Sequence, residues 1–193
     1  MDGSLSVSST PFAGRYTIER ILGRGATATV YLARDTRTDR PVAIKVLKPE
    51  LTQSMGAARF LHEIKLTQGL HHPRILPVLD SGDHDGQLYF VLPYMDGGTL
   101  RDRLDHEPQL PIADAVRTAC TVAEALAHAH AQGFVHRDVK PENILFSGGE
   151  ACLADFGIAR AIERSVEDTT TSTGIARGTP AYMSPDLVSV MVF

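Results

Sequence analysis

The sequence predicts an α+β fold with two lobes, in which a five-stranded antiparallel sheet with one main helix precedes a mainly helical lobe. Short runs rich in β-branched and aromatic residues, separated by turn residues, fill the first half of the chain. One charged amphipathic stretch interrupts them, and beyond about residue 96 the apolar residues recur at three- and four-residue steps. We therefore expect lobes at 15–95 and 96–186, between a flexible leader at 1–14 and an apolar tail at 187–193.

The first three strands are predicted at 16–22, 29–33 and 41–47, where β-branched and aromatic residues dominate. The Gly-Arg-Gly at 23–25 supplies the turn residues that join the first two strands as a hairpin. The third strand carries Lys45 among apolar neighbours, and an ammonium group in such a place needs an anion beside it.

The main helix of the first lobe is predicted at 55–70, and the His-His-Pro at 71–73 ends it. Glu63 lies in its middle. Its apolar residues are Phe60, Ile64 and Leu66. Two strand-like runs, 75–79 and 88–92, flank a turn-rich segment and complete the sheet of five strands.

The second lobe begins after an Asp-Gly-Gly linker at 96–98 with a helix whose apolar residues recur at helical spacing and predict a buried face. These residues are Ile112, Val116, Ala119, Val122, Ala123, Leu126 and Ala129. Short strand signals follow at 144–146 and 151–154. The polar stretch at 160–178 has no periodicity, which is typical of a functional or mobile loop.

Composition excludes several classes of protein. A net charge of −4, with 43% hydrophobic and 22% charged residues, describes an ordinary soluble protein rather than a basic nucleic-acid-binding protein. No run approaches the roughly twenty apolar residues of a membrane span, and the leader lacks the features of a secretory signal. Two cysteines are too few for a disulfide framework, so we expect a cytoplasmic protein.

The glycine-rich turn and Lys45 each allow two interpretations. Backbone N–H groups of the turn can close over phosphates, but a hairpin turn needs glycine for its geometry alone. Dinucleotide binding is excluded, because the motif joins two hairpin strands instead of leading from a strand into a helix. Lys45 can meet phosphate or the carboxylate of Glu63, or can extend to solvent from an edge strand.

The segment His-Arg-Asp-Val-Lys-Pro-Glu-Asn at 136–143 matches the catalytic loop of protein kinases. Asp-Phe-Gly follows at 155–157, and the run at 178–186 is similar to the end of a kinase activation segment. The glycine-rich segment at 23–30 fits the same family except that Ala28 replaces the third glycine. The chain therefore resembles a eukaryotic-type serine/threonine kinase domain of the bacterial kind, with Lys140 as the residue typical of serine/threonine specificity.

The resemblance implies a role for each charged residue. Lys45, oriented by Glu63, would hold the α- and β-phosphates of ATP, while Asn143 and Asp155 would bind Mg²⁺. Asp138 would accept the proton of the substrate hydroxyl, and Lys140 would neutralise charge on the transferred phosphate.

The resemblance also implies a nucleotide site built from both lobes, although its apolar members could equally be core residues. The residues implied to bind ATP are Leu22, Gly23, Gly25, Ala28, Val30, Ala43, Lys45, Leu92, Tyr94, Met95 and Leu145. Ala28 adds a methyl group and is expected to loosen the closure of the loop over phosphate modestly.

The loop at 160–178 contains Thr171 and Thr173, the two hydroxyls at which we expect regulatory phosphorylation. A phosphate there could pair with Arg137 and order the loop. Runs of serine and threonine also occur in loops that are simply mobile and polar, so both interpretations stand.

The sequence departs from the family after the activation segment. A kinase domain continues for several helices, whereas seven residues follow Asp186, where the family has glutamate. We therefore expect a C-terminally truncated, incomplete second lobe, and exposure of part of the apolar face around Val116, Val122 and Leu126 that favours self-association. The predicted function is transfer of phosphate from ATP to serine and threonine of protein substrates, including autophosphorylation. The alternative is a weakly active or inactive ATP-binding or interaction module.

Overall fold

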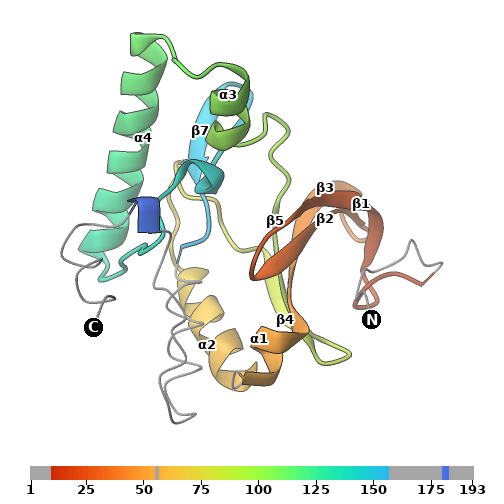
Figure 1. Ribbon diagram of the computed structural model, residues 1–193. Helices are drawn as coiled ribbons and strands as arrows, with labels where there is room; N and C mark the ends of the chain where they lie inside the picture. The colour runs from red at the N-terminus through yellow and green to blue at the C-terminus, as the bar shows by residue number, and fades with distance from the viewer. Residues whose placement is uncertain (1–9, 55–56, 157–179, 183–193) are drawn as a thin grey trace.

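The first lobe is a five-stranded antiparallel sheet in a computed structural model that describes residues 10–54, 57–156 and 180–182 (Figure 1). The strands lie in the order β1-β2-β3-β5-β4. Their bounds are β1 Tyr16–Arg24, β2 Ala28–Asp35, β3 Arg40–Leu47, β4 Asp80–His84 and β5 Gln87–Pro93. The predicted fold class is confirmed, and the glycine-rich turn joins β1 to β2 as expected.

Two helices, α1 Pro49–Ser54 and α2 Ala57–Thr67, follow β3. The second is the predicted main helix, and it buries Phe60 and Ile64 completely against the apolar cluster that also contains Leu47 and Phe90 of the sheet. The sequence analysis did not predict α1, whose first residue is a proline, a residue that favours the start of a helix.

The predicted strand at 75–79 is wrong, because β4 begins only at Asp80 and occupies most of the segment expected to be a turn. Pro77 has no N–H group for a sheet ladder, and this segment instead bonds to the second lobe through Leu76 N, which donates to Leu153 O at 2.9 Å. The turn itself consists of Asp85 and Gly86, both with positive φ, as a two-residue hairpin requires.

Hydrogen bonds and ion pairs connect the start of the first lobe to carboxylates on β2 and β4. The Arg15 guanidinium donates to both carboxylate oxygens of Asp35, at 2.9 and 2.8 Å, and to Asp80 at 3.0 Å. The hydroxyl of Tyr16 also donates to Asp80, at 2.7 Å. Asp35 is 4% exposed, and the hydrogen bonds from Arg15 hold the pKa of its carboxyl far below the ordinary range.

The second lobe contains one long helix and a two-stranded antiparallel sheet. Its elements are α3 Leu100–His106, α4 Ile112–Ala131, the short 3-10 helix η1 Pro141–Asn143, β6 Ile144–Ser147, β7 Glu150–Leu153 and a second 3-10 helix, η2 Pro180–Tyr182. Ala125 and Ala129 of α4 are fully buried in an apolar cluster with Phe146 and Leu153 of the β6–β7 sheet.

The predicted buried face of α4 is only partly correct. Of the predicted residues, Ala129 is buried, and Ala119 and Ala123 are exposed. Val122 and Leu126 pack against the cluster of the second lobe, whereas Ile112 and Val116 are 82% and 56% exposed. The α4 residues that pack in the cluster with β6 and β7 all lie in the later turns of the helix. The expected exposure around Val116 is therefore confirmed. Within the described residues, no helix is long and apolar enough to span a bilayer.

Candidate active site

The loop at 136–143 brings together three of the predicted site residues. Lys140 Nζ lies 2.6 Å from Asp138 Oδ2. Asn143 Nδ2 donates to the backbone carbonyl of Asp138 at 2.7 Å and to its Oδ2 at 3.3 Å. The loop thus presents one carboxylate between an ammonium group and an amide.

His136, to which the sequence analysis assigned no role of its own, holds this loop in place. Its side chain is buried, and Nδ1 accepts a hydrogen bond from the backbone N–H of Asp138 at 3.2 Å. The ring is therefore in the tautomer that carries its proton on Nε2, which donates to Ala154 O at 2.8 Å. Burial lowers the pKa of His136 and favours this neutral form. The signal in the sequence was its place two residues before Asp138, which is close enough for a local side-chain to backbone bond.

We expect His136→Leu to destabilise the chain by about 2 kcal/mol at pH 7.5, because the buried N–H of Asp138 and carbonyl of Ala154 would lose their partner. Since the folded state holds the pKa of His136 below its ordinary 6.5, the stabilisation is present above pH 6.5 and is lost as the pH falls through the folded value. The difference in free energy of unfolding between wild type and His136→Leu, measured with urea, should therefore become smaller from pH 7.5 to pH 5.

The matched control is His62→Leu on the exposed side of α2, for which we expect no such narrowing. If the difference in free energy of unfolding between wild type and His136→Leu stays constant or grows toward pH 5, the assigned tautomer of His136 is contradicted.

The second lobe contributes Asp155, two residues after β7, to a contact with the first lobe. Asp155 and Arg137 both have positive φ, 66° and 68°, a conformation that non-glycine residues adopt at an energetic cost. Asp155 Oδ2 forms an ion pair with Lys45 Nζ from β3, and the two side chains are only 16% and 19% exposed. The ammonium group also lies 5.7 Å from the ring centroid of Phe90.

Lys45, for which the sequence predicts Glu63 as the partner, forms an ion pair with Asp155 in the structure. Glu63 is 6% exposed on the buried face of α2. The ion pair with Asp155 thus joins Lys45 of the first lobe to the second lobe.

Most of the predicted nucleotide-binding residues lie on strands, whereas Gly25, Tyr94 and Met95 lie in the segments that follow β1 and β5. Seven apolar members belong to one apolar cluster, to which both lobes contribute; they are Leu22, Ala28, Val30, Ala43, Leu92, Met95 and Leu145. Tyr94 is half-buried, and its hydroxyl lies 3.5 Å from a guanidinium nitrogen of Arg20.

The glycine-rich turn tolerates the alanine at its third position. Ala28 is 2% exposed, belongs to the same apolar cluster, and does not have positive φ. Its carbonyl accepts a hydrogen bond from Gly25 N at 2.8 Å, which closes the turn. The methyl group of Ala28 is therefore buried in the core, and a looser closure of the loop over phosphate stays a prediction.

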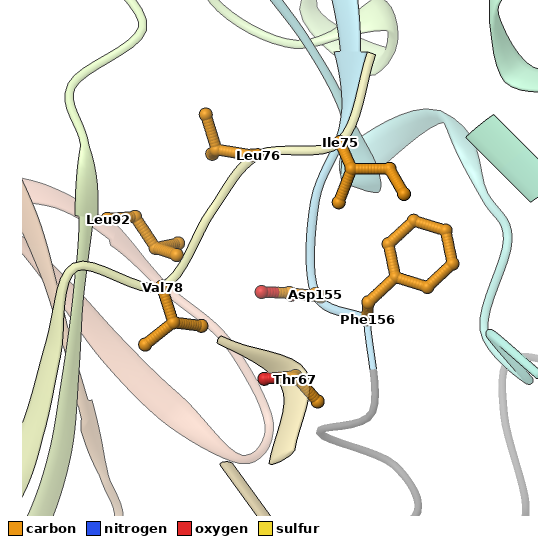
Figure 2. A pocket seen from close by; sticks show the side chains of 7 residues that line it. All are labelled: Thr67, Ile75, Leu76, Val78, Leu92, Asp155 and Phe156. Atoms are coloured by element: carbon orange, nitrogen blue, oxygen red, sulfur yellow. The ribbon is translucent and has the colours of Figure 1, made fainter. Parts of the chain in front are cut away.

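A small cavity, which the sequence analysis did not predict, lies beside Asp155 (Figure 2). Figure 2 shows the carboxylate of Asp155 directed into it, with the ring of Phe156 toward Ile75. The lining residues are Thr67, Ile75, Leu76, Val78, Leu92, Asp155 and Phe156. The hydroxyl of Thr67 donates to Ile64 O at 2.7 Å, so its polar atom is satisfied within α2. No group of three or more histidine, cysteine or acidic residues suited to a metal occurs in the described part of the chain.

Comparison with known sequences agrees with the motifs. Residues 16–191 match the family described as protein kinase domain. Serine/threonine-protein kinase PknJ of Mycobacterium tuberculosis is 42% identical over 195 residues, which cover 98% of this chain and 32% of the relative. Serine/threonine-protein kinase PknB of Mycobacterium leprae is 41% identical over 178 residues, which cover 89% and 28% of the two chains. The chain thus spans about a third of the length of these curated relatives.

Comparison with solved structures gives the same result. The crystal structure of the Mycobacterium tuberculosis PknI kinase domain has a TM-score of 0.68 and 38% identity, covering 80% of this chain and 64% of that one. The crystal structure of Rad53 in complex with AMP-PNP has a TM-score of 0.74, and the match covers 92% of this chain and 43% of that one. At 24% identity this likeness supports the fold alone.

Proposed function

Because the chain belongs to the protein kinase domain family, we propose that it transfers the γ-phosphate of ATP to serine and threonine hydroxyls of proteins. One observation carries the proposal: Lys45 from the sheet lobe pairs with Asp155 from the second lobe, beside the loop that presents Asp138. Phosphoryl transfer depends on positioned charge more than on covalent chemistry by the protein, and this cluster supplies charge of both signs.

Asp138 is the proposed proton acceptor for the substrate hydroxyl. Its carboxylate is held by Lys140 and by the amide of Asn143, so the side chain is already oriented. Lys140, whose side chain is 23% exposed, is the cation proposed to stabilise negative charge on the transferred phosphate.

Lys45 is the proposed ligand of the α- and β-phosphates, with Glu63 as the carboxylate that orients it. Gly23, Gly25 and Ala28 are proposed to cover the phosphates, and the apolar cluster between the lobes to hold the adenine. In this proposal the backbone of 93–95 forms the polar edge of the adenine site.

The residues proposed for Mg²⁺ fit this cation. Asn143 donates through Nδ2 to Asp138, which leaves its amide oxygen Oδ1 as the atom that can bind a metal. Asp155 contributes a carboxylate directed into the space between the lobes. Hard oxygen donors are the ligands that Mg²⁺ prefers, and the cation would neutralise charge on the phosphates when bound.

Regulation by phosphorylation remains a proposal, since Thr171 and Thr173 lie outside the described residues. A phosphate on either threonine is proposed to pair with Arg137, which is exposed beside Asp138. The described residues also exclude Thr179, the tail at 187–193, and the segment at 178–186 apart from 180–182.

A second candidate function is an ATP-binding or interaction module, and the exposed side chains of Ile112 and Val116 on α4 favour it. Large apolar side chains side by side on a helix surface are typical of contact with another protein surface.

The experiment that tests the proposal is an assay of phosphate transfer from γ-labelled ATP to casein by the purified chain. We expect labelling of casein in Mg²⁺ and its loss in excess EDTA, because Asn143 and Asp155 are proposed to act through the cation. If ATP raises the melting temperature but casein stays unlabelled in Mg²⁺, the second candidate is the correct one.

A further inference from the structure

The linker between the lobes is attached at its far end to one strand of the second lobe. Gly97 N donates to Phe146 O at 2.8 Å, and Phe146 N donates to Gly98 O at 2.9 Å. Thr99 forms an isolated bridge with Leu145, and Ser147 Oγ donates to Asp96 Oδ1 at 2.8 Å. Residues 96–99 therefore run beside β6 almost as an additional strand.

The approach of the linker to β6 is close enough to require glycine. A Cβ atom added at Gly97 would lie 2.7 Å from the carbonyl oxygen of Phe146, and Gly98 has a φ of +70°. Because the linker is so close, a shift in Phe146 must shift residues 97 and 98 as well.

Arg103 of α3 covers the ring of Phe146 from the other side. Its guanidinium carbon lies 3.5 Å from the ring centroid, and Phe146 is 3% exposed. Thr99 is the N-cap of α3 and forms a capping box with Asp102, so the helix that carries Arg103 starts at the attached linker. No carboxylate in the described residues lies within ion-pair distance of Arg103, which leaves the aromatic ring as the partner of its charge.

Phe146 has Leu145 as its neighbour on the opposite side of β6. Phe146 belongs to the cluster of the second lobe, whereas Leu145 packs in the cluster proposed to hold the adenine. Because side chains alternate along a strand, Leu145 lies on the face of β6 toward the proposed adenine site, and Phe146 lies on the opposite face, in contact with Arg103.

We infer that Arg103 is a positioning residue for ATP binding, which acts by holding Phe146 and, through it, the linker and Leu145 in place. The inference rests on the proposed function. Arg103 touches none of the residues proposed for phosphate or metal, so its loss should weaken nucleotide binding and leave the transfer step unchanged.

The test compares Arg103→Met, which keeps a long apolar side chain, with Arg103→Lys, which keeps a cation over the ring. We expect Arg103→Met to raise both the Kd and the KM for ATP about three- to ten-fold, with kcat within about two-fold of wild type. Arg103→Lys should recover part of the loss. Hydrogen exchange at the amides of Gly97 and Phe146, which are bonded across this contact, should become faster in Arg103→Met.

The matched control is Arg101→Met on the same helix, since Arg101 forms an ion pair with Asp105. It should change neither the Kd for ATP nor the exchange at Gly97.

Unchanged exchange and unchanged ATP affinity in Arg103→Met would overturn the inference, as would a loss of kcat at constant KM. Failure of the proposed function would give a different result, in which wild type binds ATP but does not label casein. Hydrogen exchange at Gly97 and the Kd for ATP would still show whether Arg103 positions the site.

Discussion

Replacing Asp138 by asparagine is expected to lower phosphate transfer about a thousand-fold while leaving the fold intact. Asparagine has the same shape and keeps the backbone bonds of residue 138 to His136 and Asn143. It cannot accept the proton of a substrate hydroxyl as the carboxylate can, and general base catalysis contributes typically 10²- to 10⁴-fold. The measurement is kcat with casein and labelled ATP.

The control for Asp138→Asn is Glu150→Gln, which also removes one carboxylate but from an exposed ion pair with Arg74. It should retain wild-type kcat. ATP affinity of the Asp138→Asn variant should stay within about three-fold of wild type, because the proposed role of Asp138 is in transfer rather than in nucleotide binding. Retention of more than a tenth of the wild-type kcat would argue against Asp138 as the proton acceptor.

The second large effect is expected on stability, where Asp35→Ala should lower the free energy of unfolding by about 3 kcal/mol at pH 7. Asp35 is 4% exposed, and each of its carboxylate oxygens accepts a hydrogen bond from a different nitrogen of Arg15. Removing Asp35 takes away the bidentate partner of a half-buried guanidinium and leaves it only the contact with Asp80. Urea unfolding of both proteins gives the difference directly.

The pH dependence of the Asp35 effect has a definite sign. The folded state holds the pKa of Asp35 below its ordinary 3.8, so the stabilisation is complete above that value and is lost as the pH falls toward the folded value. The difference between wild type and Asp35→Ala should thus be constant from pH 5 to 8 and smaller below about pH 4.

The matched control is Asp39→Asn in the same turn. Asp39 is 86% exposed and lies 3.5 Å from Arg34, so its replacement should change stability by less than about 0.5 kcal/mol. A loss of similar size in the two variants would show that the effect of Asp35 is not due to its buried ion pair.

The outline of the fold was predictable because most of its strands are buried and bounded by turn residues. The strands β1, β2, β3 and β5 have the β-branched and aromatic composition that identifies a strand from sequence. The edge strand β4 reads Asp-Ser-Gly-Asp-His and depends on backbone pairing with β5 alone, so it has no such signature. In the apolar run at 75–79, which was mistaken for the strand, Ile75 and Leu76 pair with Leu153 of β7 in the other lobe.

The candidate site was predictable to the extent that it is local in sequence. Asp138, Lys140 and Asn143 contact one another within a single short loop, so their spacing already placed them together. The ion pair between Lys45 and Asp155 joins residues 110 positions apart and depends on how the two lobes meet. Burial patterns within either lobe carry no information on that contact.

In α4 the periodicity predicted the helix, whereas the exposure around Val116 was expected only from the resemblance to the family. A helical stripe of apolar residues shows that a face can be buried, and only the structure shows that β6 and β7 reach Val122 and Leu126 but not Ile112. Periodicity alone therefore does not say how much of a helix is covered.

The most direct test of the proposed activity is to map, by mass spectrometry, the residues of casein that gain phosphate after incubation with the purified chain and Mg-ATP. The account predicts phosphate on serine and threonine with wild type and none with Asp138→Asn. Phosphate confined to tyrosine, or equal labelling by the two proteins, would contradict the assignment of this chain as a serine/threonine kinase that uses Asp138.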